Sequence, residues 1–321
     1  MVKKVAVLTS GGDAPGMNAC VRAVIRSGLK NGLDMFVVYE GYLGLVQDNI
    51  EQVDRNFVSD IINRGGTILK SARLPEFKDE AVRKIAVDNL RRRGIDGLIC
   101  IGGDGTYIGA KKLTEMGVKT VGLPGTIDND VASSDETIGF DTCLNTICDC
   151  VDKIRDTTAS HQRCTFIEVM GNRCGDLALY SGIAEGVEMI ISSDHPIPED
   201  EIMKTLIRLR DGKKKHSLVI VSEKTFPDLN AFVKKVQQET GIETRAQILG
   251  HIQRGGAPSA RDRVLATQFG VAAIEALLSG ESGICIGVVN NKIVHYDIYE
   301  ALALPRNKHF DLLRIVGLVN R

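Results

Sequence analysis

Glycines and carboxylates gather in two turns between residues 96 and 130. The first turn, residues 102–106, reads GGDGT and follows the apolar run 98–101; the second, residues 124–130, reads PGTIDND and follows the apolar run 120–123. Glycine lets a backbone approach a ligand closely, and residues 107–116 have the apolar spacing of a helix whose first N–H groups would favour an anion. The first turn therefore predicts a phosphate-sized site.

Two parallel strands joined by one helix end at the same edge of a sheet. That arrangement would bring three carboxylates to one crevice, those of Asp104, Asp128 and Asp130. Like charges so close together are costly unless a cation lies among them, and a polyphosphate with Mg²⁺ supplies one in phosphoryl transfer. The alternative for the first turn alone is a glycine-rich turn that only closes a βαβ unit.

A third glycine turn, residues 10–18, follows a strand at residues 5–9 and begins a helix with an apolar face. It lacks the Gly-Lys-Ser/Thr ending of a Walker loop. Arg22 and Arg26 lie four residues apart on this helix, and a like-charged pair at that spacing costs roughly 0.2–0.5 kcal/mol unless an anion lies between the two. The arginines therefore indicate either an anion site or a solvated basic face.

Other predicted turns contain basic side chains. Residues 63–73 form a glycine turn that ends in Arg73, whose guanidinium could neutralise charge on a transferred phosphate or lie at the surface beside Glu76. Residues 41–45 (GYLGL) are predicted to be a turn after a strand at 36–39, and residues 211–216 to be a basic turn before a strand at 217–222. Four basic side chains could hold a sugar phosphate or form ordinary ion pairs: Arg163, Arg245, His251 and Arg254.

Composition limits the class of protein. The chain has 321 residues, 43% hydrophobic and 25% charged, which is enough for two packed α/β lobes. A net charge of −1 and the absence of Trp argue against a nucleic-acid partner. There is no signal peptide pattern and no run of about 18 apolar residues, so a cytoplasmic location without a membrane partner is expected. The eight cysteines lack metal-ligand spacing and are expected to be buried, reduced thiols.

GGDGT alone is shared with NAD kinases and lipid kinases, but GGDGT followed by PGTIDND resembles the 6-phosphofructokinase family in its bacterial, ATP-dependent form. The resemblance extends from Gly11 to about Asp297 through six separated motifs. It implies an α/β fold of two Rossmann-like three-layer lobes with mostly parallel sheets and the active site in the cleft between them. Residues 1–139 with about 257–303 would form the nucleotide-binding lobe, and about 140–256 with 304–321 the sugar-phosphate-binding lobe.

The resemblance also implies roles in the phosphorylation of fructose 6-phosphate at its C1 hydroxyl. Asp128 would be the general base and Asp130 would orient it, while Asp104 would hold Mg²⁺ on the β- and γ-phosphates of ATP. Gly11, Arg73 and Thr126 would position and neutralise the migrating phosphoryl group. The implied ATP-binding residues are Gly11, Arg73, Leu74, Gly103, Asp104, Gly105 and Thr106.

Two further sets follow from the resemblance. The implied sugar-phosphate contacts are Thr126, Ile127, Asp128, Arg163, Met170, Gly171, Glu223, Arg245, His251 and Arg254, with Arg163 and Arg245 reaching in from a neighbouring subunit of a homotetramer. The implied contacts for an allosteric effector, ADP/GDP or phosphoenolpyruvate, are Arg22, Arg26, Arg55, Arg155, Gly186, Glu188, Lys214, Lys215 and His216. Whether an effector activates or inhibits does not follow from sequence, because that depends on which global state it binds better.

One position departs from the family pattern. The family has Arg directly after Met-Gly, where this chain has Asn172, and Arg173 stands one place later. A shift of one residue redirects a side chain, so the sequence transfers the role of that arginine to neither residue. A weakly active or regulatory paralogue is therefore an alternative. A pyrophosphate-dependent enzyme is a second one, which Gly105 and Gly125 oppose, because members that use pyrophosphate tend to carry Asp and Lys there.

Overall fold

The computed structural model describes residues 2–212 and 214–319. Lys213, in the basic turn predicted at 211–216, lies outside the described residues. The chain divides into two compact units, one of Met1–Thr142 with Arg254–Arg306 and the other of Cys143–Gln253 with Asn307–Arg321.

The first unit is built on a seven-stranded sheet with the strand order β11-β10-β5-β4-β1-β2-β3. Its strands are β1 (Lys4–Thr9), β2 (Asp34–Val38), β3 (Ile50–Val53), β4 (Gly97–Gly102), β5 (Lys119–Pro124), β10 (Ile284–Val289) and β11 (Lys292–Asp297). Its helices are α1 (Met17–Lys30), α2 (Gly41–Gln47), α3 (Glu80–Arg93), α4 (Asp104–Glu115), α9 (Ala260–Ser279) and α10 (Ile298–Ala303), with a short 3₁₀ helix η1 (Pro75–Lys78). The pairs β2–β3 and β10–β11 are antiparallel, and the other neighbours are parallel.

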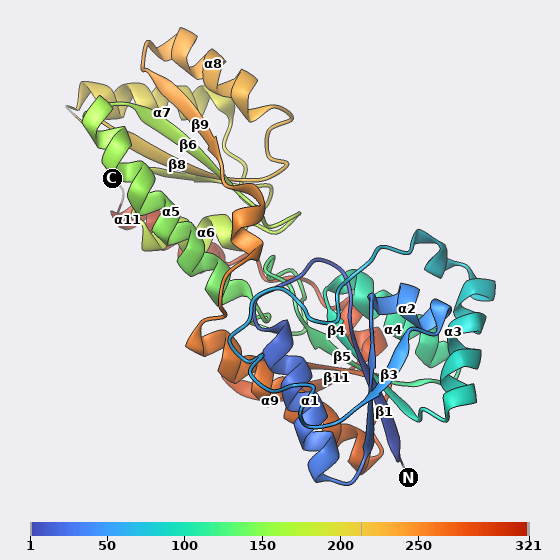
Figure 1. The fold of residues 1–321 in the computed structure, drawn as a ribbon. Helices are drawn as coiled ribbons and strands as arrows, with labels where there is room; N and C mark the ends of the chain where they lie inside the picture. Colours follow the sequence, from blue (N-terminus) through green and yellow to red (C-terminus); the bar gives the residue numbers. More distant parts are fainter. Residues whose placement is uncertain (1, 213, 320–321) are drawn as a thin grey trace. The chain divides into compact units, whose positions relative to one another are not determined.

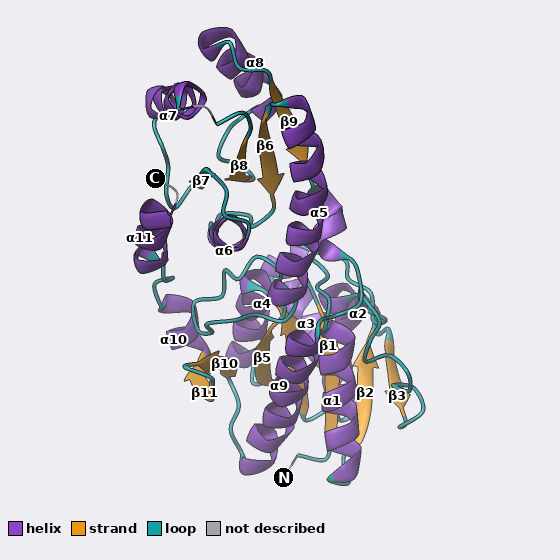
Figure 2. Ribbon diagram, turned by 90° about the vertical axis from the view of Figure 1, so that its left-hand side faces the viewer, coloured by secondary structure: helices purple, strands orange, loops and turns teal. Residues whose placement is uncertain are grey.

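Helices cover both faces of this sheet, which explains why β1 and β4 read as continuous apolar runs rather than as alternating ones. Helices α1 and α9 lie side by side on one face (Figures 1 and 2). On the other face, side chains of α2, α3 and α4 form one buried cluster with alternate residues of the strands, including Leu8, Leu98 and Cys100. Helices on both faces of the sheet therefore hold in place the edge at which the glycine turns lie.

The second unit has a four-stranded, wholly parallel sheet in the order β7-β8-β6-β9. Its strands are β6 (Cys164–Val169), β7 (Met189–Ile191), β8 (Ser217–Ser222) and β9 (Thr244–Ile248), and its helices are α5 (Phe140–His161, which begins in the first unit), α6 (Asp176–Ala184), α7 (Glu199–Asp211), α8 (Leu229–Thr240), α11 (Phe310–Val319) and the 3₁₀ helix η2 (Gly250–Arg254). Leu206 of α7, Phe232 of α8 and Phe166 of β6 belong to one buried cluster. The predicted α/β fold with mostly parallel sheets is confirmed.

Two local predictions were wrong. Residues 41–45, predicted as a turn, begin helix α2. The two glycines of that helix are required by packing, because a Cβ on Gly41 would lie 2.9 Å from the Thr9 carbonyl oxygen and one on Gly44 would lie 1.8 Å from that of Tyr39. Burial of the cysteines was also overstated: all eight are free thiols, but Cys148 and Cys150 on α5 are only partly buried. Within the described residues no helix has the length and apolar composition needed to cross a bilayer.

Candidate functional site

The three glycine turns of the first unit meet at one edge of its sheet. They follow β1, β4 and β5, which are adjacent parallel strands, so all three leave the sheet at its carboxyl edge. Backbone hydrogen bonds join the turns: Ser10 N–H donates to the Ile101 carbonyl and Gly125 N–H to the Gly102 carbonyl, each at 3.0 Å. The prediction that the turns after β4 and β5 lie together is correct. The structure adds the turn after β1 to them.

Two glycines of the turn after β4 differ in their surroundings. A Cβ on Gly102 would lie 2.2 Å from Thr106 Oγ1 and 2.4 Å from the Ser10 carbonyl oxygen, so the close approach of the turns requires glycine. A Cβ on Gly105, in the first turn of α4, would have no heavy atom within 4 Å. The start of α4 therefore opens toward solvent, where its N–H groups favour an anion.

Asp104 is the first residue of α4 and is exposed. Even so, enough protein surrounds its carboxyl group that desolvation, together with the nearby Asp130 carboxylate, raises the pKa of Asp104 to about 6, while Arg306 acts in the opposite direction. Asp104 and Asp130 thus lie close enough to repel each other. Arg306 is a nearby cation that sequence reasoning missed, because nothing in its local sequence marks it.

These two carboxylates fit a magnesium site. Hard carboxylate oxygens are the ligands that Mg²⁺ prefers, and the ion is commonly held by one or two of them with phosphate and water oxygens completing the shell. The described residues contain no cluster of three or more His, Cys, Asp or Glu side chains that could hold a metal.

Asp128 is buried, with 7% of its surface exposed. Its N–H donates to Thr126 Oγ1 at 3.2 Å, and its Oδ2 lies 3.9 Å from Arg254 Nη2. Arg254 also donates from Nη1 to the Asp13 carbonyl at 3.2 Å, and a Cβ on Gly12 would lie 2.5 Å from that nitrogen. Arg254 is thus held between the first glycine turn and Asp128. The neighbouring Ile127 has no exposed surface.

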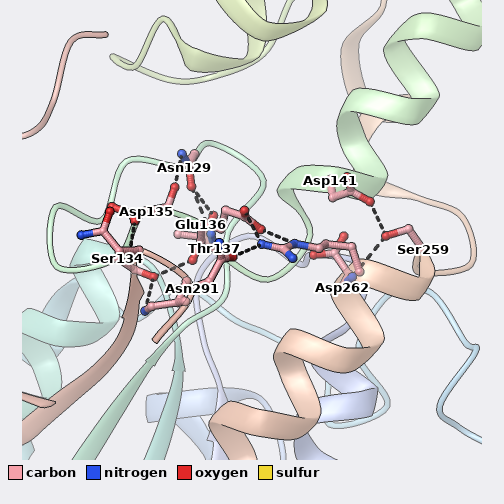
Figure 3. Close-up of polar contacts among 12 residues, drawn as sticks. Asn129, Ser134, Asp135, Glu136, Thr137, Asp141, Ser259, Asp262 and Asn291 are labelled. Carbon is pink, nitrogen blue, oxygen red and sulfur yellow. Dashed lines mark hydrogen bonds and ion pairs between the residues drawn. The ribbon is translucent and has the colours of Figure 1, made fainter. Parts of the chain in front are cut away.

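The loop that carries Asp128 is fixed by its own polar groups, as Figure 3 shows. Asn129 has a left-handed backbone (φ 51°), accepts a hydrogen bond from Thr137 N–H at 3.0 Å and donates to the Asp135 carbonyl at 3.2 Å. The Thr137 hydroxyl donates to the Thr126 carbonyl at 2.6 Å. Three of the residues that could carry the chemistry, 126, 128 and 130, therefore lie on a loop that is cross-linked before any ligand binds.

Asp262, in the first turn of α9, anchors the end of that loop. Its carboxylate accepts from Gly139 N–H and Thr142 N–H, each at 2.8 Å, and from the Thr142 hydroxyl, while the N-cap residue Ser259 accepts from Asp262 N–H. Desolvation raises the pKa of Asp262 despite these hydrogen bonds. Only 1% of the surface of Asp262 is exposed.

We expect Asp262→Ala to lower the free energy of unfolding by about 2–4 kcal/mol, because it leaves two buried N–H groups without acceptors. Urea unfolding of the purified variant measures this loss. Asp34→Ala, which removes an exposed carboxylate of the same unit, is the matched control and should change stability by less than about 0.5 kcal/mol.

Arg73 and Leu74 lie between the first glycine turn and η1. The Ser71 hydroxyl donates to the Gly11 carbonyl, which ties this segment to the turn, and Leu74 packs on the buried cluster. Arg73 is exposed. Tyr42 was missed by sequence reasoning: its hydroxyl donates to the Thr106 carbonyl, and its ring stacks on Phe77 of η1 at 4.3 Å. It connects the start of α4 with the segment that carries Arg73.

In the second unit, all but one of the predicted sugar-phosphate contacts fall into two groups. Met170, Gly171 and Glu223 lie together where β6 and β8 end, since Glu223 N–H donates to the Val169 carbonyl at 2.7 Å. Arg163 and Arg245 converge on one carboxylate, that of Glu243, at 2.8 and 2.7 Å. His251, on η2, is exposed.

The predicted effector residues also form a group within each unit. In the first unit, desolvation and then the nearby charges of Arg26 and Arg55 lower the pKa of Arg22, so these three cations lie near one another. In the second unit, Arg155 donates to Glu185 beside Gly186, and Lys214 pairs with Glu188. A pocket of ≈ 480 Å³ in that unit is lined by Lys214, Lys215, His216 and also Arg163. The first group is a concentration of positive charge suited to an anion. In the second group, Glu185 and Glu188 pair with two of the cations.

Comparison with known proteins fits this geometry. The model of the phosphofructokinase family matches residues 4–277. The ATP-dependent 6-phosphofructokinases of Photobacterium profundum and Aliivibrio fischeri are 54% identical over 305 residues and 53% over 319 residues, which is 94% and 98% of both chains, respectively. The phosphofructokinase structure from Saccharomyces cerevisiae superposes with a TM-score of 0.90 at 35% identity and covers 98% of this chain, which spans 50% of the yeast chain. The chain belongs to the phosphofructokinase family.

Proposed function

We propose that this chain is an ATP-dependent 6-phosphofructokinase, which transfers the γ-phosphoryl group of ATP to the C1 hydroxyl of fructose 6-phosphate in glycolysis. The observation that carries the proposal is the meeting of three glycine turns with Asp104, Asp128 and Asp130 at one sheet edge. Curated relatives of nearly the same length that are more than half identical carry that name. A cytoplasmic location is part of this proposal.

Asp128 would take the proton from the attacking hydroxyl. A general base must be held within hydrogen-bond reach of that proton and must stay ionised. The cross-linked loop would hold the carboxylate in place for the first condition, and the guanidinium of Arg254, 3.9 Å away, would favour the second. Asp130 would orient the base, and Thr126 would contact both the sugar and the transferred group.

Gly11, Arg73 and the N–H groups of residues 103–106 would hold the donor phosphates. Phosphoryl transfer depends mainly on positioning and on neutralising charge, and the tie between Ser71 and Gly11 places Arg73 on a segment anchored at the first turn. Mg²⁺ held by Asp104 would neutralise charge on the β- and γ-phosphates. Leu74 would contribute contact through its backbone or its exposed face.

The remaining predicted contacts belong to the same proposal. Fructose 6-phosphate would contact Met170, Gly171, Glu223, His251 and Arg254, with Arg163 and Arg245 supplied to a neighbouring subunit of a homotetramer. ADP/GDP or phosphoenolpyruvate would bind as an effector at the cation groups around Arg22 and Lys214. The neighbouring arginines of the first unit and the basic residues that line the pocket of the second unit support the assignment of the effector sites.

A coupled assay of fructose 1,6-bisphosphate formation with ATP or with pyrophosphate tests the function. Activity with ATP and Mg²⁺ is expected, and activity with pyrophosphate alone would overturn the assignment of the donor. The alternative that Asn172 favours is a regulatory paralogue. Tight binding of both substrates with negligible single-turnover transfer would establish that alternative instead.

Gly105 provides a test of donor selection. We expect Gly105→Asp to lower kcat/KM for ATP at least tenfold, because a carboxylate placed at the open start of α4 would repel the donor phosphates. Gly105→Ala, which adds only a Cβ in open space, is the matched control and should retain most of the activity. Equal loss in both variants would show that backbone freedom, rather than charge, is what this position requires. Steady-state kinetics with varied ATP measures the difference.

A further inference from the structure

Two turns follow neighbouring strands of the second unit. Strands β6 and β8 are parallel and in register, with Val169 opposite Ser222, so both turns leave the same edge of the sheet. After β6, Cys174 N–H donates to the Gly171 carbonyl at 2.7 Å. After β8, Thr225 N–H donates to the Ser222 carbonyl at 3.3 Å, and the hydroxyls of these two residues lie 2.9 Å apart.

Each turn contains a non-glycine residue with a left-handed backbone, Asn172 at φ 56° and Lys224 at φ 65°. Asparagine is well represented in that region, whereas lysine is disfavoured there and a turn would usually place glycine or asparagine at such a position. Residues held in sparsely populated conformations concentrate at binding sites and active sites. The left-handed backbone of Lys224, beside Asn172 of the adjacent turn, is therefore informative.

Side chains tie the two turns together. Asn172 N–H donates to Glu223 Oε1 at 2.7 Å, and the Lys224 ammonium donates to Asn172 Oδ1. An amide oxygen orients the ammonium without neutralising its charge. The ammonium has three donors, and the bond to Asn172 uses one of them. Lys224 is exposed, so its other donors can reach a ligand.

We propose that Lys224 is a substrate-contacting residue for the phosphorylated sugar and that Asn172 is the positioning residue that directs it. The inference rests on the proposed function, since Met170, Gly171 and Glu223 are assigned there to the sugar phosphate. A carboxylate that accepts beside an ammonium that donates suits the adjacent oxygens of a polyhydroxy ligand. Sequence reasoning left Asn172 without a role and did not consider Lys224.

Lys224→Met removes the ammonium and keeps most of the aliphatic stem. KM for fructose 6-phosphate is expected to rise about tenfold or more, as for the loss of a charge-assisted hydrogen bond, while KM for ATP stays within about twofold. Lys224→Arg should recover most of the affinity. An unchanged KM for fructose 6-phosphate, or an equal rise of both KM values, would overturn the proposal.

Asn172→Gly tests the positioning role, because glycine accepts the left-handed backbone and removes only the tether. We expect a smaller rise in KM for fructose 6-phosphate than in Lys224→Met, and no further rise when the two changes are combined. Additive effects would contradict the claim that Asn172 acts through Lys224.

The matched control is Lys204→Met, which removes an exposed lysine of the same unit that pairs with Asp200 on α7. Its KM values should equal those of the unchanged chain. Wild-type protein is assayed first with ATP and fructose 6-phosphate. Absence of turnover there would overturn the proposed function itself, whereas normal turnover with an unaffected Lys224→Met variant would overturn only this inference.

Discussion

The Asp128→Asn variant is expected to lose roughly 10²–10⁴ in kcat while KM for both substrates changes little. The amide occupies nearly the same volume and can still accept from groups around it, but it cannot take the proton from the C1 hydroxyl. The loop is held by Asn129 and Thr137 through contacts that do not use the Asp128 carboxylate. Its geometry should therefore survive the change.

Steady-state and single-turnover kinetics, together with a binding titration of fructose 6-phosphate, measure this effect. Asp34→Asn, at the exposed start of β2, removes one carboxylate from the same unit and should be kinetically silent. A variant that loses affinity but keeps kcat would show that Asp128 binds substrate rather than acting as the base.

The Asp104→Asn variant is expected to lose 100-fold or more in kcat/KM for ATP with Mg²⁺, about 3 kcal/mol of transition-state stabilisation. The amide keeps one neutral oxygen but loses the charge that holds the ion. In thermal unfolding experiments, ATP with Mg²⁺ should stabilise the wild-type chain strongly and the variant only weakly. Equal stabilisation of both proteins would remove Asp104 from the proposed metal site.

The stability difference between the wild-type chain and Asp104→Asn should depend on pH, because the pKa of Asp104 is raised to about 6 from an ordinary value of 3.8. Between these values the folded chain binds the proton more tightly than the unfolded chain, so the contribution of Asp104 to stability falls as pH rises and is unfavourable above pH 6. Metal-free Asp104→Asn should therefore be more stable than wild type near pH 8, with the difference shrinking toward pH 5. Affinity for Mg²⁺ should fall as pH drops through 6, because the ion needs the ionised carboxylate.

Helix α2 illustrates where sequence patterns fail. The segment GYLGLVQ has two glycines, which favour a turn, yet it is helical because those glycines pack against the carbonyls of Thr9 and Tyr39 and Tyr42 stacks on Phe77. Helix α11 was not anticipated either, because the segment carried no recognised motif. None of its residues is buried. At α2, packing against distant segments outweighs local propensity.

By itself, the sequence determined the family, the α/β class and the meeting of the glycine turns at one sheet edge. These depend on local patterns: apolar runs that form strands, glycines that end them, and the rule that parallel strands end on the same side. Only the tertiary structure decided which groups face one another. Arg254 lies against Asp128, Arg306 near Asp104 and Lys224 on Asn172, although each pair is separated by many residues. Such contacts depend on how strands and helices pack, which no local pattern encodes.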